Sequence, residues 1–293
     1  MDAVITYVNG NDPVWKKDYE EFTNVSLMGK RFRDWGTLKY LLRGIEAKMP
    51  FIRNVYLVVS HPSQVPEWAD VSQLNIVLHK DIIPEEFLPT FNSNPIEMHL
   101  HRIKGLDEEY LYFNDDMFPV GDCVREDFFR DGKGVIGMYR HFLSLNMYKK
   151  ICRNSDVFAR QALGMPLSSF YIRPQHICSP MLKSACEEVY EKAADAVRRI
   201  SSSRTRTERD ACQYIFLDYM YHKGLIIPEK ISNKHFSVAL ASPAKLSAFL
   251  TNPSRKMVCI NDVHLSEKRF ATLHSAVIQA FEKKFPYKSR FEK

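Results

Sequence analysis

Short apolar runs that end in polar turn residues alternate with helical patterns along the first half of this 293-residue chain. The runs predict strands at residues 3–8, 54–60, 75–79 and 110–113. Between the first two, apolar residues at the i, i+3, i+4, i+7 spacing predict an amphipathic helix (Leu38, Leu41, Leu42 and Ile45). A second helix is expected over 95–103 and a further strand over 134–139. Strands alternating with helices predict an α/β fold with a mainly parallel, covered sheet.

The second half has a different pattern, in which long helical periodicities dominate. Helices are expected at residues 181–200, 208–222 and 266–284. A polar loop rich in Ser, Thr and Arg, residues 201–207, separates the first two. We therefore divide the chain into an α/β part (1–139), a connecting segment (140–170) and a largely helical part (171–293).

Composition and charge exclude several classes of protein. With 45% hydrophobic and 26% charged residues, the chain is of the soluble globular type, and no apolar stretch is long enough to span a membrane. Its start lacks the features of a signal peptide, and the six scattered cysteines are expected to be reduced and buried, so we expect a cytoplasmic protein. The net charge of +6 is spread along the chain without a nucleic-acid motif. We expect no nucleic-acid partner; phosphorylated small molecules or an anionic membrane surface explain the charge equally well.

Familiar phosphate-binding and hydrolase motifs are absent from the sequence. There is no GxGxxG after a strand, no GxxxxGK[ST], no HExxH and no GxSxG. These absences argue against a dinucleotide-dependent dehydrogenase, a P-loop kinase, a zincin and a serine hydrolase. A bound phosphate would have to be held by a metal and by arginine.

Two apolar runs end in amides and carboxylates of the type that bind hard cations. The run 110–113 is followed by Asn114-Asp115-Asp116, and the run 257–260 by Asn261-Asp262. Carboxylates at the carboxyl end of a strand are suited to Mg²⁺ over phosphate oxygens. Adjacent aspartates in a turn are more often structural, but the repetition of the pattern favours a metal site.

The remaining candidates each have a structural alternative. Asp12 follows the first strand and either forms a turn-capping contact or acts as a base. Arg31 and Arg33 either bind phosphate or are solvated, and Asp34 either contacts a ligand or caps the next helix. His176 stands alone in a loop. Arg206 and Asp210 have the i, i+4 spacing of a helix-surface ion pair.

Together these segments resemble the Stealth family, the sugar-1-phosphate transferases of bacterial capsule and surface-polysaccharide synthesis, to which the N-acetylglucosamine-1-phosphotransferase of animals is related. Four blocks occur in order: 2–15 (DAVITYVNGNDPVW), 31–118 (including RFRD, LPTFNSNPIE and YLYFNDDMF), 173–210 and 258–262 with the closing 285–292. Asn9 departs from the aspartate of many bacterial members. RTRTERD lacks the usual aromatic residue before its arginine, and the register from His176 favours Arg206 over Arg204.

The resemblance implies a nucleotide-sugar-transferase-like fold of GT-A or Rossmann-like type, and a reaction. A sugar 1-phosphate passes from a UDP-sugar to a hydroxyl of a glycan or lipid-linked oligosaccharide, and UMP is released. It further implies that 1–139 binds donor and metal, that 140–170 lies on the acceptor side, and that 171–293 completes the same domain. Association with the inner membrane surface, if present, is peripheral.

The resemblance also implies roles for residues of this chain. The catalytic residues are Asp12, Asp116, His176 and Arg206, with His176 and Asp12 both candidates for the general base. The ligands of a divalent metal, Mg²⁺ or Mn²⁺, are Asp115, Asp116, Asn261 and Asp262. The donor contacts are Asn9, Gly10, Asn11, Arg31, Arg33, Asp34, Asn92 and Arg102.

Two rival functions remain. A metal-dependent glycosyltransferase would use the acidic pair in the same way, but it would break the sugar–oxygen bond and release UDP. A non-catalytic sugar- or nucleotide-binding protein would keep the fold alone, although intact polar residues in all four blocks argue against it.

Overall fold

The computed structural model describes residues 1–23, 32–261 and 265–293. Its largest sheet has five strands in the order β10-β4-β1-β2-β3. These strands are β1 (Asp2–Thr6), β2 (Val55–Val59), β3 (Asn75–Leu78), β4 (Glu109–Asn114) and β10 (Ser179–Leu182). The chain forms two compact units: Met1–Val4, Val77–Tyr112 and Arg125–Ile231 make the first, and Ile5–Ile76, Phe113–Val124 and Ser232–Lys293 the second.

Contacts at the strand ends show that most of this sheet is parallel. The amide of Tyr7, just after β1, donates to the carbonyl of Val58 near the end of β2 (3.1 Å), so these strands end at the same edge. Asn75 Nδ2, at the start of β3, donates to the Val55 carbonyl at the start of β2 (3.3 Å). Asp107, just before β4, pairs with the chain's amino group just before β1 (2.9 Å). The edge strand β10 pairs with β4 in the antiparallel direction. The predicted α/β fold with a mainly parallel sheet is confirmed.

The first unit holds the helices of the middle of the chain. They are α3 (His79–Ile82), α4 (Ser93–Met98), α5 (Met147–Ala162), α6 (Lys183–Lys192), α7 (Ala194–Ser201) and α8 (Tyr214–His222), with 3₁₀ turns η2 (Glu85–Phe87), η3 (Leu100–Arg102) and η4 (Arg125–Asp127). Its short strands are β6 (Phe129–Arg130), β7 (Lys133–Val135), β8 (Met138–His141), β9 (Tyr171–Pro174) and β11 (Ile226–Ile227).

Two predicted helices of this unit differ from the structure. The helix predicted at 181–200 is interrupted: Met181 and Leu182 are buried in β10, and α6 and α7 meet at Ala193. The helix predicted at 208–222 begins only at Tyr214, because the preceding residues form a loop around the buried Asp210. Hydrogen bonding in the folded chain outweighs local helical periodicity in both places.

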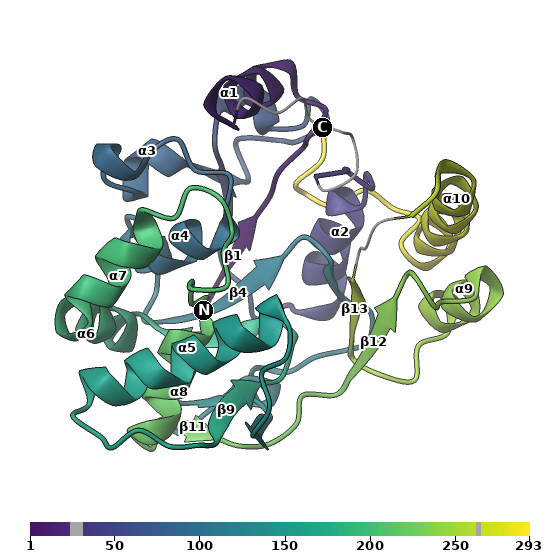
Figure 1. Cartoon of the computed structure of the whole chain (residues 1–293). Helices are drawn as coiled ribbons and strands as arrows, with labels where there is room; N and C mark the ends of the chain where they lie inside the picture. Colours follow the sequence, from purple (N-terminus) through teal and green to yellow (C-terminus); the bar gives the residue numbers. More distant parts are fainter. Residues whose placement is uncertain (24–31, 262–264) are drawn as a thin grey trace. The chain divides into compact units, whose positions relative to one another are not determined.

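Helices α5 and α8 pack side by side in the first unit (Figure 1). Asp218, in α8, is completely buried. Neither of its carboxyl oxygens has a hydrogen-bond partner among the described residues. Burial, and secondly the negative charge of Asp156 on α5, raise the pKa of Asp218 well above its usual value. The folded chain therefore favours the protonated form of this carboxyl group more than the unfolded chain does.

This buried acid should make the protein less stable as the pH rises. The unfolded chain releases the Asp218 proton above a pKa of about 3.9, whereas the folded chain keeps it, so stability falls by up to about 1.4 kcal/mol per pH unit between the two pKa values. Asp218→Asn cannot ionise and should therefore gain stability relative to wild type between pH 5 and pH 8. Thermal unfolding at both pH values measures this, with the exposed Glu191→Gln as control. If the melting temperature of Asp218→Asn differs from that of wild type by the same amount at pH 5 and at pH 8, the raised pKa of Asp218 is contradicted.

The second unit contains the helices of both ends of the chain. They are α1 (Pro13–Thr23), α2 (Leu38–Lys48), α9 (Pro243–Thr251) and α10 (Glu267–Lys284), with the 3₁₀ turn η1 (Pro62–Gln64). A small sheet in the order β12-β13-β5 consists of β5 (Met117–Pro119), β12 (Asn233–Ser237) and β13 (Met257–Asn261). Helices α9 and α10 lie against each other (Figure 1). The four apolar residues that predicted α2 are all buried, which confirms that helix.

Two expectations from composition can be compared with the structure. All six cysteines are free and buried, as predicted. Among the described helices, none combines the length and the apolar character that crossing a membrane requires.

Candidate active site

The loop that follows β1 is held by its own side chains and by one glutamine. Asn9 Oδ1 accepts a hydrogen bond from the amide of Asn11 (2.9 Å). Gln64 holds the backbone of Asn9 on both sides: its Oε1 accepts from the Asn9 amide (2.6 Å) and its Nε2 donates to the Asn9 carbonyl (3.1 Å). Gly10 donates its amide to the Phe32 carbonyl, and a Cβ at Gly10 would lie 2.3 Å from that oxygen. The loop therefore requires glycine at this position.

Asp12 caps the first turn of α1. Its Oδ1 accepts a hydrogen bond from the amide of Trp15 (2.8 Å), and the side chain is buried. This is the structural alternative predicted for Asp12, and it accounts for a carboxylate at this place without any role in catalysis.

Tyr7 connects two of the candidate carboxylates. Its hydroxyl donates to Asp34 Oδ2 (3.0 Å). Burial raises the pKa of Tyr7 most, and the charges of Asp34 and then Asp115 raise it further, so Tyr7 remains a neutral donor. The other oxygen of Asp34 accepts from the amide of Gly36 (2.8 Å), and α2 begins only at Leu38. The alternative that Asp34 caps this helix is therefore wrong.

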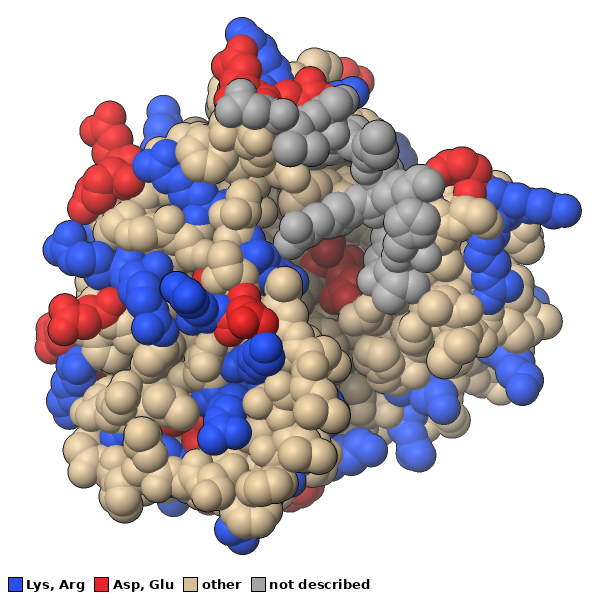
Figure 2. All heavy atoms as spheres, viewed as in Figure 1, with Lys and Arg blue, Asp and Glu red and all other residues tan. Residues whose placement is uncertain are grey.

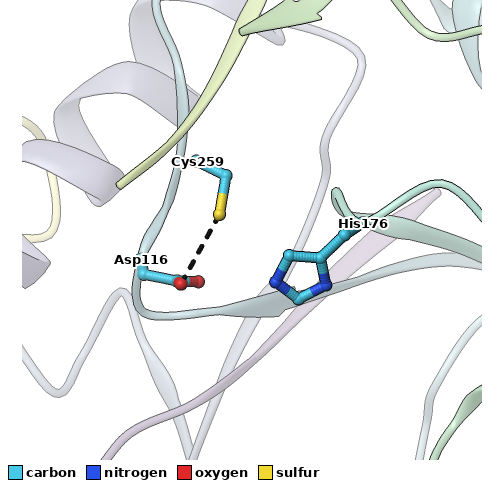
Figure 3. Close-up of side chains that lie close together, drawn as sticks. All are labelled: Asp116, His176 and Cys259. Carbon is cyan, nitrogen blue, oxygen red and sulfur yellow. Dashed lines mark hydrogen bonds between the residues drawn. The ribbon is translucent and has the colours of Figure 1, made fainter. Parts of the chain in front are cut away.

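Asp115 and Asp116 form the two-residue turn between β4 and β5. Because β5 pairs with β13, this turn lies beside the end of β13: the amide of Ile260 donates to the Asp116 carbonyl (2.9 Å). The thiol of Cys259 donates to Asp116 Oδ2 (3.5 Å; Figure 3). Asn261 ends the same strand. The two apolar runs that each end in an amide and carboxylates thus meet within the second unit, while Asp262 lies outside the described residues.

The donor atoms at this turn suit a hard divalent cation. Asp115, Asp116 and Asn261 are half-buried and offer carboxylate and amide oxygens, the ligands that Mg²⁺ and Mn²⁺ prefer. Burial, and secondly the charge of Asp116, raise the pKa of the Cys259 thiol well above its usual value. In this structure Cys259 donates its thiol hydrogen to Asp116.

Arg33 contacts two residues of α10. Its guanidinium pairs with Glu267 (2.8 Å) and lies over the ring of Phe270, with Cζ 4.0 Å from the ring centroid. Only 11% of the Arg33 side chain is exposed, so the solvated alternative is wrong. Arg31 lies outside the described residues.

His176, which Figure 3 also labels, belongs to the first unit and is held there by tyrosines. Its Nδ1 lies 2.9 Å from the Tyr214 hydroxyl, which is 3.1 Å from the hydroxyl of Tyr148. Burial raises the pKa of both tyrosines, so both are neutral phenols. In the tautomer in which Nδ1–H donates to Tyr214 and Tyr214 donates to Tyr148, Nε2 carries a lone pair and can accept a proton.

Asp210 organises the arginine-rich loop of the first unit. Its Oδ1 accepts from the hydroxyls of Ser203 (2.6 Å) and Thr207 (2.9 Å). Its Oδ2 accepts from the side-chain amides of Asn92 (2.8 Å) and Asn94 (3.1 Å) and from the backbone amide of Thr207 (3.1 Å). The alternative of a surface ion pair between Arg206 and Asp210 is therefore wrong. Asn92 also donates to the Ser203 carbonyl (2.8 Å), so both its amide hydrogens are used inside the protein.

Two arginines of the loop around Asp210 make different contacts. Arg204 donates to the backbone carbonyl of Glu86 (3.0 Å). Arg206 is exposed and donates to Ser93 Oγ at the start of α4 (2.6 Å). The buried Glu97 lies within range of its charge: burial raises the pKa of Glu97, and Arg206 partly opposes this shift. Arg206, with an exposed guanidinium beside a helix start, is better placed than Arg204 to receive an anion. Arg102 is also exposed, at the end of η3.

The predicted residues are divided between the units. The second unit contains nine of them: Asn9, Gly10, Asn11, Asp12, Arg33, Asp34, Asp115, Asp116 and Asn261. The first contains four: Asn92, Arg102, His176 and Arg206. Sequence reasoning missed Tyr7, Gln64, Cys259 and Tyr214, which support the candidates through hydrogen bonds. The sequence indicated these four residues only indirectly, because each lies near a candidate residue or inside a block that resembles the family.

Comparison with known proteins establishes the family. The family model described as Stealth protein CR2, conserved region 2, matches residues 31–136. The capsular polysaccharide phosphotransferase WcwK of Streptococcus pneumoniae is 31% identical over 329 residues, which cover 100% of this chain and 99% of the relative. The chain belongs to the Stealth family. It is a phosphotransferase.

Other relatives of this Stealth protein match over the same extent. The receptor polysaccharide phosphotransferase WefC of Streptococcus oralis is 30% identical over 332 residues, covering 100% of this chain and 99% of the relative. The exopolysaccharide phosphotransferase cps2G of Lactiplantibacillus plantarum is 28% identical over 328 residues, with coverage of 100% and 96%. Among solved structures, galactosyltransferase LgtC in complex with donor and acceptor sugar analogs matches with a TM-score of 0.36 and 12% identity, covering 94% of this chain and 96% of that chain.

Proposed function

We propose that this Stealth protein transfers a sugar 1-phosphate from a UDP-sugar to a hydroxyl of a glycan, as part of the synthesis of a surface polysaccharide such as a capsule, exopolysaccharide or lipopolysaccharide. The acceptor is a glycan or a lipid-linked oligosaccharide. The observation that carries the proposal is identity of about 30% over the whole chain to enzymes named as polysaccharide phosphotransferases. The oxygen-rich turn of Asp115 and Asp116 supports it. We infer a cytoplasmic location from the six free, buried cysteines.

The reaction forms one phosphorus–oxygen bond and breaks another. The acceptor hydroxyl attacks the β-phosphorus of the UDP-sugar, and the bond from that phosphorus to the bridging oxygen breaks. UMP leaves with this oxygen, and the sugar remains joined to the acceptor through a phosphodiester. Such a transfer needs positioning and neutralisation of charge more than covalent help from the protein.

Asp115, Asp116 and Asn261, with Asp262, would hold Mg²⁺ or Mn²⁺ in this enzyme. A divalent cation supplies positive charge that screens the diphosphate and stabilises the leaving phosphate. The chain's own part is to hold the oxygen ligands. Cys259 donates to Asp116 Oδ2, and the Ile260 amide fixes the backbone of Asp116. Both contacts restrict the carboxylate to one arrangement.

His176 is proposed as the general base. The acceptor proton passes to Nε2, while Nδ1–H donates to the Tyr214 hydroxyl, 2.9 Å away. This hydrogen bond orients the ring and stabilises the imidazolium that forms. Asp12 is the weaker candidate, because its carboxylate already caps α1.

Arg206 would supply a fixed positive charge to the transferring phosphoryl group. The rigid loop with Asn9, Gly10 and Asn11 is proposed to contact the donor, together with Arg31, Asp34 and Arg102. Arg33 pairs with Glu267 and Asn92 donates both amide hydrogens inside the protein, so we propose that they shape the donor-binding segments instead.

A nucleotide assay with a panel of UDP-sugars and a glycan acceptor tests the proposal. Turnover should release UMP, because the β-phosphorus leaves with the sugar. UDP as the released nucleotide, with a product free of phosphorus, would identify a glycosyltransferase instead.

A further inference from the structure

Large apolar side chains are exposed together in one segment of the first unit. Phe142, Leu143, Leu145, Met147, Leu167 and Phe170 are the members of this group, called here the apolar surface. The most exposed are Leu145, at 77%, and Leu167, at 60%. Soluble proteins rarely gather so many large apolar side chains at their surface without a partner for them.

The strands β8 and β9 bring the two ends of this segment together. They pair antiparallel with His141 opposite Tyr171, so that Phe142, just after β8, lies beside Phe170, just before β9. The rings of Phe142 and Phe170 are in contact, with centroids 5.3 Å apart. The Tyr171 hydroxyl donates to the Leu143 carbonyl (3.1 Å), which holds the following residues against β9. Phe142 and Phe170 therefore lie together on a hydrogen-bonded framework, and the other exposed apolar residues lie within a few positions of them in the sequence.

The segment that carries the apolar surface is mostly basic, although Lys150 is paired with Glu208 (2.6 Å). Residues 138–173 include six basic side chains: Arg140, Lys149, Lys150, Arg153, Arg160 and Arg173. Their one acid, Asp156, is buried and binds Arg160 (2.8 Å) and His222 (2.7 Å). The Arg140 guanidinium lies over Phe170, with Cζ 3.9 Å from the ring centroid. Figure 2 shows broad uncharged surface over α5 and β9, with blue Lys and Arg spheres set into it and red Asp or Glu spheres at its edge.

We propose that the apolar surface docks this enzyme onto the face of an anionic lipid bilayer. Aromatic and aliphatic side chains enter the boundary between headgroups and acyl chains, and basic side chains beside them meet anionic headgroups. Arg140, which lies against Phe170 with its charge at the edge of the ring, combines both interactions. The basic side chains favour an anionic bilayer over a second copy of the chain as the partner. A symmetric contact between two copies through this surface would bring like charges together.

Flotation with lipid vesicles tests the proposal. Wild type should float with vesicles of phosphatidylcholine containing about 30% phosphatidylglycerol, and less with pure phosphatidylcholine, because each basic residue adds to binding only on an anionic surface. Added salt should weaken the binding. Leu143→Ser combined with Leu145→Ser should reduce it at least about tenfold, since two exposed leucines are lost from the boundary. Arg140→Gln combined with Lys149→Gln should reduce it by about as much, on anionic vesicles only.

Leu240→Ser is the matched control, because Leu240 is 89% exposed in the second unit and should be replaced without effect. Melting temperatures near that of wild type establish that the variants are folded. The proposal is overturned if wild type does not bind the anionic vesicles, or if the Leu143/Leu145 variant binds them as well as wild type. It is also overturned if that variant instead converts a dimer to a monomer in light scattering while vesicle binding stays unchanged, which would identify a second copy as the occupant.

Discussion

Asp116→Asn should reduce turnover by about 10²–10³-fold while the protein stays folded, a loss of a few kcal/mol of transition-state stabilisation. Asparagine keeps the shape of the side chain and an oxygen for the Cys259 thiol, but it removes the negative charge that holds a divalent cation. The Ile260 contact uses the backbone carbonyl and is unaffected. Steady-state kinetics over a range of Mg²⁺ concentrations measure the effect, and Asp115→Asn should behave similarly.

Chelation separates a metal role from a structural one. An excess of chelator should abolish the activity of wild type, and Mg²⁺ or Mn²⁺ should restore it. Asp122→Asn is the matched control: Asp122 lies in the same unit, its exposed side chain pairs with Lys48 (2.8 Å), and the variant should remain active. Full activity in excess chelator, or in both Asp115→Asn and Asp116→Asn, would mean that the turn is only structural.

His176→Ala should lower turnover by roughly 10²–10⁴-fold with donor binding almost unchanged, because it removes the group that accepts the acceptor's proton. Tyr214→Phe should cause a smaller loss, on the order of tenfold, since Nδ1 loses its oriented partner while the imidazole itself is kept. Initial rates give the turnover and calorimetry gives the affinity for the UDP-sugar. Arg206→Ala should be as inactive as His176→Ala, whereas Arg204→Ala should keep more activity because Arg204 binds a backbone carbonyl.

Asp12→Ala tests the competing base. Loss of the cap on α1 should reduce stability by about 1 kcal/mol, the usual value for a helix cap, and should leave more turnover than His176→Ala. If His176→Ala keeps most of its turnover while Asp12→Ala does not, the general base is Asp12.

The fold was predictable where a local pattern and the tertiary structure agree. The runs that became β1, β2, β3 and β4 are short, apolar and bounded by turn residues, and the observed strands lie within two residues of the predictions. The helix α2 follows its apolar periodicity because one side of it is buried. The meeting of the Asp115-Asp116 turn with the end of β13 was suggested by the repeated pattern of an apolar run followed by polar residues. Antiparallel pairing of β5 with β13 brings them together.

The remaining features depend on contacts that are distant in the sequence. Met181 and Leu182 have helical spacing, yet they pair with β4 because an edge position in the sheet is available to them. Asp210 resembles a helical residue until its five hydrogen-bond donors, from segments around residues 92 and 205, are placed around it. Tyr214 belongs to an apolar helix, and nothing in its local sequence indicates that its hydroxyl meets His176.

The fate of the β-phosphorus is the most direct test of the proposed reaction. A UDP-sugar labelled with ³²P at that position can be incubated with the enzyme, Mg²⁺ and a glycan acceptor, and the products separated. Sugar 1-phosphate transfer predicts that the label appears in the glycan and that the released UMP is unlabelled. Label recovered in UDP, with none in an elongated glycan, would contradict the proposed function.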